Sequence, residues 1–103
     1  MTNELRTEIE NAIYDGLAEI WCITREHARQ RFSLDYHPTL DKDVDPDDID
    51  MVLIPDLHKK FRIEIPAVEW SRTGTIGEAV ELIGRYVTEA QNQGGKTRNE
   101  KEP

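Results

Sequence analysis

Apolar residues recur at helical spacing in two long stretches of the chain, one near each end. The first stretch runs from about Asn3 to Trp21, and its apolar positions are three or four residues apart: Leu5, Ile9, Ile13, Leu17 and Ile20. This spacing places them on one face of a helix. Gly16 lies within the stretch and costs about 1 kcal/mol relative to alanine. We interpret it as a weak spot in a core helix, the alternative being a close helix contact.

The stretch near the other end begins at a capping box. Thr75 and Glu78 have the spacing at which the threonine hydroxyl accepts from the glutamate N–H while the carboxylate bonds back to the threonine N–H. The apolar positions that follow share one face: Ile76, Ala79, Val80, Ile83 and Val87. We predict a helix that ends near Ala90 or Gln91. Residues 92–103 contain no apolar residue, so we expect a folded domain over residues 1–91 and a disordered polar tail.

A shorter apolar stripe lies in the middle of the chain and predicts a helix from about Asp47 to Phe61, with Ile49, Leu53, Leu57 and Phe61 on its buried face. Pro55 falls inside this helix. A proline there removes a backbone hydrogen bond and collides with the preceding turn, at about 3 kcal/mol. We therefore predict a kink between Met51 and Pro55, or a split that places Pro55 in the first turn of a second piece.

The remaining segments are shorter. Thr24 is a candidate N-cap for a helical turn through Ala28 and Gln30. From Arg31 to Pro46 the periodicity is lost, which predicts a long loop whose apolar residues anchor it to the core: Phe32, Leu34, Tyr36 and Leu40. After Pro66 we predict a short helix from Ala67 to about Ser71, with Val68 and Trp70 buried.

Composition narrows the class of protein. The chain has 103 residues, enough for one domain, and a net charge of -8, which argues against nucleic acid as a partner. No apolar run approaches the roughly 20 residues of a membrane span, and the start of the chain has no signal pattern. We expect a monomer in the cytoplasm. The single cysteine, Cys22, excludes an internal disulfide, and we expect it to be buried.

Two chemical alternatives find little support in the sequence. Asp41, Asp43, Asp45 and Asp47 alternate like the start of a calcium loop, but Pro46 stands at the turn position that needs glycine and Val52 at the place of the bidentate glutamate. We expect weak divalent binding at most and no dedicated metal site. The histidines, His27, His37 and His58, have no local partner pattern, and we expect no catalysis.

The order of these elements resembles that of acyl carrier proteins. The shared features are a first helix, a long loop, an acidic start to the second helix, the segment from Phe61 to Ile65-Pro66, a short helix and a capped last helix. The spacing from Phe61 to Pro66 and on to Ile76 matches that family without a gap. The resemblance implies an all-α, acyl-carrier-protein-like four-helix bundle with a long first loop and a short third helix.

The same resemblance implies a cofactor, 4'-phosphopantetheine, but we expect this chain to lack the serine that attaches it. Acyl carrier proteins attach 4'-phosphopantetheine to a serine at the start of the second helix. Counting back from Phe61 places that serine at Asp47, and counting forward from Leu40 places it at Asp48. A phosphoryl group on a carboxylate is a labile acyl phosphate. We therefore expect no 4'-phosphopantetheine, and neither Ser33 nor Ser71 precedes a matching helix start.

The resemblance also implies a surface for partner enzymes along the second helix. The acidic residues that retain it are Asp45, Asp47, Asp48, Asp50 and Asp56, and the basic residues Lys59, Lys60 and Arg62 then reverse the sign. Helix-dipole electrostatics explain the same distribution. We expect a non-carrying module that binds another protein, such as an acyl-transfer or synthase enzyme. The alternative is a genuine carrier modified at an unexpected residue.

Overall fold

The computed structural model describes residues 1–37 and 45–101, and side-chain surroundings for all of these except residue 46 and residues 92–101. Within these ranges every regular element is helical. The elements are α1 (Asn3–Trp21), α2 (Arg25–Arg31), α3 (Pro46–Asp48), the π-helix η2 (Ile49–Leu53), α4 (Ile54–Phe61), α5 (Ala67–Ser71) and α6 (Ile76–Lys101). The predicted all-helical bundle with a short third helix is confirmed.

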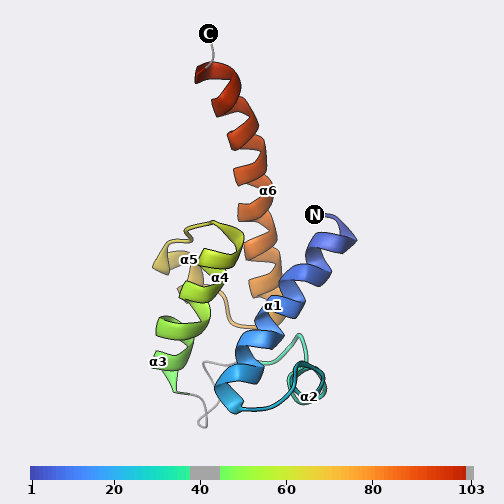
Figure 1. Cartoon of the computed structure of the whole chain (residues 1–103). Helices are drawn as coiled ribbons and strands as arrows, with labels where there is room; N and C mark the ends of the chain where they lie inside the picture. The colour runs from blue at the N-terminus through green and yellow to red at the C-terminus, as the bar shows by residue number, and fades with distance from the viewer. Residues whose placement is uncertain (38–44, 102–103) are drawn as a thin grey trace.

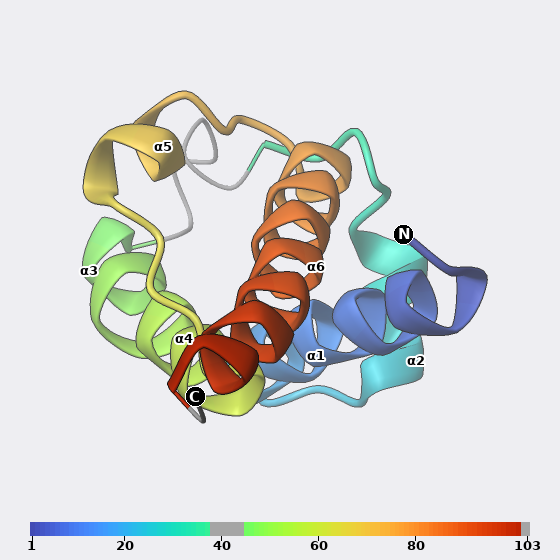
Figure 2. The same cartoon turned by 90° about the horizontal axis from the view of Figure 1, so that it is seen from above.

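The core lies where α1 and the first half of α6 pack together. Figures 1 and 2 show these two helices at the centre, with α3, α4 and α5 on one side and α2 on the other. Both predicted apolar stripes face inward: Ile9, Ile13 and Leu17 on α1, and Ile76, Val80, Ile83 and Val87 on α6, are buried. Burying these side chains is the main stabilisation of the bundle, at about 25 cal/mol per Å² of apolar surface.

The second predicted helix is split, as Pro55 required. Pro55 lies in the first turn of α4, and the wider turn η2 precedes it. The Ile54 N–H donates to the Ile49 carbonyl, five residues back instead of four. A π-turn moves the preceding carbonyls outward, which makes room for a ring that cannot donate a hydrogen bond.

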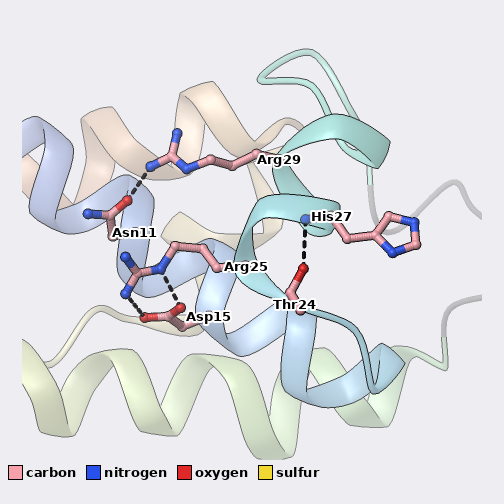
Figure 3. A network of polar contacts seen from close by, with 6 residues as sticks. All are labelled: Asn11, Asp15, Thr24, Arg25, His27 and Arg29. Atoms are coloured by element: carbon pink, nitrogen blue, oxygen red, sulfur yellow. Dashed lines mark hydrogen bonds and ion pairs between the residues drawn. The ribbon is translucent and has the colours of Figure 1, made fainter.

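Helix α2 is held against α1 by polar contacts (Figure 3). The Thr24 hydroxyl accepts from the His27 N–H at 3.1 Å, which confirms the predicted N-cap. The Arg25 guanidinium donates to both carboxylate oxygens of Asp15, at 2.6 and 2.7 Å. Arg29 donates to the Asn11 side chain. These contacts fix the position of α2, which buries only Ala28 itself.

The residues after α2 behave as predicted only in part. Phe32 is fully buried, and the Tyr14 hydroxyl donates to the Phe32 carbonyl at 2.8 Å. Tyr36 packs against the core, whereas Leu34 is exposed. The proposed anchor Leu40 lies outside the described residues.

Helix α6 is longer than predicted. The expected end near Ala90 or Gln91 is wrong, because the helix continues to Lys101 through residues that were predicted to form a disordered tail. Figure 1 shows this extension projecting away from the bundle. The backbone hydrogen bonds of a helix are local, so a helix can continue without an apolar face to bury. The division between a domain and a tail at residue 91 stays a prediction.

Two burial predictions are wrong. Val68 is 55% exposed, and α5 buries none of its residues fully, although Trp70 packs partly against the core. Cys22 is exposed and ends α1 in the left-handed conformation, with φ of 56°. A residue at a helix C-cap points its side chain away from the helix face that precedes it, so the apolar neighbours of Cys22 in sequence do not bury it.

Candidate functional site

The candidate site is the outer face of the split second helix, formed by α3, η2 and α4. Asp45 fixes its start, because one of its carboxylate oxygens accepts from the Asp47 N–H at 3.0 Å and its carbonyl accepts from the Asp48 N–H at 3.0 Å. The residues of α3 are Pro46, Asp47 and Asp48, none of which carries a hydroxyl. The start of the helix thus presents two carboxylates and no hydroxyl group.

The charged residues predicted for partner binding all reach solvent. Seven of them are exposed, namely Asp45, Asp47, Asp50, Asp56, Lys59, Lys60 and Arg62, and Asp48 is partly exposed. The acidic residues gather toward the start of the helix and the basic residues at its end. Arg62 itself ends α4 in the left-handed conformation, with φ of 54°.

Sequence reasoning missed the apolar residues on this face. Met51 is 73% exposed and Val52 is 39% exposed, and Pro55 is also exposed one turn further on. For this helix, the sequence predicted only the buried apolar stripe that includes Leu53 and Leu57. Exposed methionine and valine beside charged residues are common at protein interaction surfaces.

An apolar cavity of about 610 Å³ lies behind this helix. Its wall combines residues of α1, η2, α4, α5 and the start of α6: Ile13, Leu17, Ile49, Asp50, Leu53, Ile54, Leu57, His58, Ile65, Ala67, Trp70, Ser71, Thr73, Gly74, Thr75, Ile76 and Ala79. Of the residues predicted for partner binding, only Asp50 contributes to the wall. The volume is in the range of small-molecule sites. No sequence signal predicts it, since it depends on how far apart the helices pack.

His58 organises one wall of the cavity. Its Nε2 accepts from the Ile65 N–H at 3.3 Å and from the Trp70 Nε1–H at 3.2 Å. Both hydrogen bonds use Nε2 as the acceptor, so the ring holds a backbone donor and a side-chain donor at one atom. The sequence shows no local partner pattern for His58, whereas in the structure it is a partly buried residue that joins α4 to α5.

The capping box at the start of α6 lies beside the same cavity and is confirmed. The Thr75 hydroxyl accepts from the Glu78 N–H at 3.1 Å, and the Glu78 carboxylate accepts from the Thr75 N–H at 3.0 Å. It also accepts from the Gly74 N–H at 3.2 Å. These backbone donors stabilise the charged form and lower the pKa of Glu78.

The predicted calcium-loop pattern falls largely outside the described residues. Asp41 and Asp43 are not among them, so the hypothesis of weak divalent binding is untested. Within residues 1–37 and 45–101, no group of three or more His, Cys, Asp or Glu side chains is arranged to hold a metal ion. In the same ranges no helix is long and apolar enough to cross a membrane.

The fold and this face define a small helical protein whose split, acidic second helix precedes an Ile-Pro segment, a short helix and a capped helix. The sequence is 37% identical to the acyl carrier protein of Lactobacillus johnsonii over 84 residues, which cover 81% of this chain and 94% of that protein. The chain therefore belongs to the acyl carrier protein family. No family model matches the sequence. No solved structure matches it either.

Proposed function

We propose that this member of the family does not carry an acyl group and instead binds another protein through the face that extends from Asp45 to Arg62. The observation that carries the proposal is the composition of α3. Its three residues, Pro46, Asp47 and Asp48, offer no hydroxyl for a phosphodiester. The proposed role needs no catalysis, and the expected partner is an acyl-transfer or synthase enzyme.

Neither of the two possible attachment positions carries a hydroxyl. The two counts of the sequence place the attachment position at Asp47 or Asp48, and the π-turn that follows moves the helix phase by about one residue. Pro46, the residue before them, has no hydroxyl either. A carboxylate that attacked the phosphoryl donor would form an acyl phosphate, which hydrolyses readily. The residues present at the start of the helix do not fit the prosthetic group.

The exposed face supports the protein-binding part of the proposal. It combines acidic residues, basic residues and the exposed side chains of Met51 and Val52 on one continuous helical segment. Charged residues around a small apolar centre suit a reversible protein contact, because the charges orient the partner and the apolar centre supplies affinity.

The mass of the protein tests the proposal directly. The purified protein is incubated with coenzyme A and a promiscuous phosphopantetheinyl transferase and then weighed by mass spectrometry, beside an ordinary acyl carrier protein as positive control. We expect no mass change in this protein. A gain equal to one phosphopantetheine arm would overturn the non-carrying role. The Asp47→Ser and Asp48→Ser variants test whether the helix start is otherwise competent, and a gain in one of them identifies the attachment register.

The cavity favours a second candidate function, a carrier modified at another residue. Its wall is mainly apolar and includes Ser71, whose hydroxyl donates to the Val68 carbonyl at 2.7 Å. A group held on Ser71 or Ser33 would appear in the same mass measurement, and the Ser71→Ala and Ser33→Ala variants would locate it. We place this candidate second because neither serine begins a helix of the required kind.

A further inference from the structure

We propose that the apolar cavity behind the second helix binds a free amphiphile with an apolar chain and a cationic head group, and that the head group donates hydrogen bonds to Asp50. The inference rests on where the cavity opens and on which polar groups of its wall are already engaged. It is independent of the proposed function, because a freely diffusing ligand needs no attachment residue and no partner protein.

The cavity has an aliphatic inner end and a polar mouth. Its buried lining residues form the inner end and are all aliphatic: Ile13, Leu17, Leu53, Leu57, Ile65 and Ile76. Three other lining residues are exposed, namely Asp50 of η2 and both Ala67 and Ser71 of α5. A residue that lines a cavity and also reaches solvent lies where the cavity opens. The mouth therefore lies between η2 and α5.

The inner end determines what the body of the ligand can be. An aliphatic wall offers no hydrogen bond, so a polar group carried into it would lose its water without compensation. An apolar chain gains about fourfold in affinity for each methylene group that leaves water. The volume of about 610 Å³ is large enough for a ligand and not only for a single side chain.

Asp50 determines the charge that suits the mouth. It is the only Asp, Glu, Lys or Arg among the described residues of the wall. In the part of the chain whose side chains are described, its carboxylate has no hydrogen bond and no ion pair. A carboxylate accepts hydrogen bonds and does not donate them. A head group that donates hydrogen bonds and carries a positive charge therefore complements this mouth.

The hydroxyl and indole donors of the wall are already engaged within the fold. Each of them donates to a group of the protein: Ser71 to the Val68 carbonyl at 2.7 Å, Thr73 to the Glu69 carbonyl at 2.9 Å, Thr75 to the Glu78 carboxylate at 3.2 Å and Trp70 to His58 at 3.2 Å. An anionic head group needs donors and would meet the Asp50 carboxylate instead. The mouth thus favours a cationic head over a carboxylate or a phosphate.

Three ligands that share one chain and differ in head group test this preference. Isothermal titration calorimetry near neutral pH compares decylamine, 1-decanol and decanoate, each below its micelle concentration. We expect decylamine to bind about fivefold or more tightly than decanol, and decanoate to bind most weakly. Octylamine, which is two methylene groups shorter, should bind about fifteenfold less tightly than decylamine. Equal affinities of the amine and the alcohol, a preference for decanoate, or no binding of decylamine at millimolar concentration would overturn the proposal.

Asp50→Asn tests the position of the head group. We expect it to lower the affinity for decylamine about fivefold and to leave that for decanol unchanged. A protein with a net charge of -8 attracts any cation, so a variant with the same charge change elsewhere is needed. Asp56→Asn provides it, on an exposed residue of α4 that does not line the cavity, and should keep the wild-type affinity. Equal losses in the two variants would reduce the effect to general attraction and refute the contact with Asp50.

Ala79→Leu tests the position of the chain. Ala79 lines the cavity from α6, so the added carbons take up part of its volume. We expect weaker binding of decylamine and decanol alike, and far-ultraviolet circular dichroism verifies that the variant is folded. Amide chemical shifts of the wild-type protein give a second measurement: decylamine should move those of Leu57 and Ile76 at the inner end and leave that of Ala28 in α2 in place. Shifts confined to surface acidic residues would contradict binding in the cavity.

Discussion

Gly16 of α1 lies directly against the Leu53 side chain of η2, so closely that a β-carbon at position 16 would overlap the Cδ1 atom of Leu53. Leu53 is buried in the core. The sequence alone favoured a weak spot in α1, with a close helix contact as the alternative, and the structure supports the alternative. The missing side chain lets η2 approach α1 at the place where the second helix widens around Pro55.

Gly16→Ala is therefore expected to destabilise the protein although alanine favours a helix. The gain in helix propensity is about 1 kcal/mol, and forcing an extra carbon into a packed core costs about 1–3 kcal/mol. We expect a net loss of about 1 kcal/mol in the free energy of unfolding, measured by urea denaturation.

Truncating Leu53 supplies the control. Leu53→Ala removes the atoms that the new carbon would meet, at a cost of about 2–5 kcal/mol of its own. In that background Gly16→Ala should become stabilising, which gives a coupling energy of about 1 kcal/mol or more between the two sites. Additive effects would show that the close contact does not determine the choice of glycine.

The helices that the sequence located correctly are those whose signals are local. The stripe from Leu5 to Ile20 predicted the bounds of α1, and the pairing of Thr75 with Glu78 predicted the start of α6, since each needs only a few neighbouring residues. Pro55 predicted the split in the second helix for the same reason. The charged residues of the candidate face were named from the resemblance to acyl carrier proteins, and the structure shows that they reach solvent. Their role in partner binding stays a prediction.

What the sequence did not predict depends on distances between elements. His58 links α4 to α5 because the packing of these helices brings it within hydrogen-bond distance of Trp70. The cavity depends on the spacing between the five elements that line it. The exposure of Val68 follows from how α5 lies on the bundle. The end of α6 was misplaced because an absence of apolar residues was taken to mean an absence of helix.

Cys22 offers a test of the left-handed C-cap of α1. Residues other than glycine are disfavoured there by about 1 kcal/mol, because the β-carbon crowds the carbonyl oxygen. We expect Cys22→Gly to be more stable than Cys22→Ala by about 1 kcal/mol in thermal or urea unfolding. The same two substitutions at Arg62, which ends α4 with a similar φ, should give the same order. Equal stability of glycine and alanine at both positions would contradict the assignment of these caps.

His58→Phe tests the bridge between α4 and α5. The substitution keeps an aromatic ring but removes the acceptor shared by the Ile65 N–H and the Trp70 indole N–H. We expect the free energy of unfolding to fall by about 1–2 kcal/mol and the fluorescence of Trp70 to change, as its indole loses a partner. His58→Gln, which retains an acceptor oxygen, should lose less. An unchanged stability in His58→Phe would mean that water satisfies both donors equally well.

Low pH should reduce the free energy of unfolding through the carboxylates of Asp15 and Glu78. The bidentate hydrogen bonds from Arg25 lower the pKa of Asp15, and the backbone donors of the capping box lower the pKa of Glu78. A carboxyl whose pKa is lower in the folded than in the unfolded state stabilises the fold above its unfolded pKa, which is about 4, and loses that contribution as the pH falls through its folded pKa. The free energy of unfolding should therefore decrease from about pH 5 downward.

Glu78→Gln separates the capping box from the rest of this acid dependence. Glutamine keeps an oxygen that accepts from the Thr75 N–H but has no proton to gain, so its unfolding free energy should vary less steeply with pH below about pH 5. Glu89→Gln, on an exposed residue of α6, is the matched control and should keep the wild-type slope. If the two variants follow the same curve in urea titrations across this range, the capping carboxylate is not a source of the acid sensitivity, and the ion pair of Asp15 with Arg25 becomes the group to remove next.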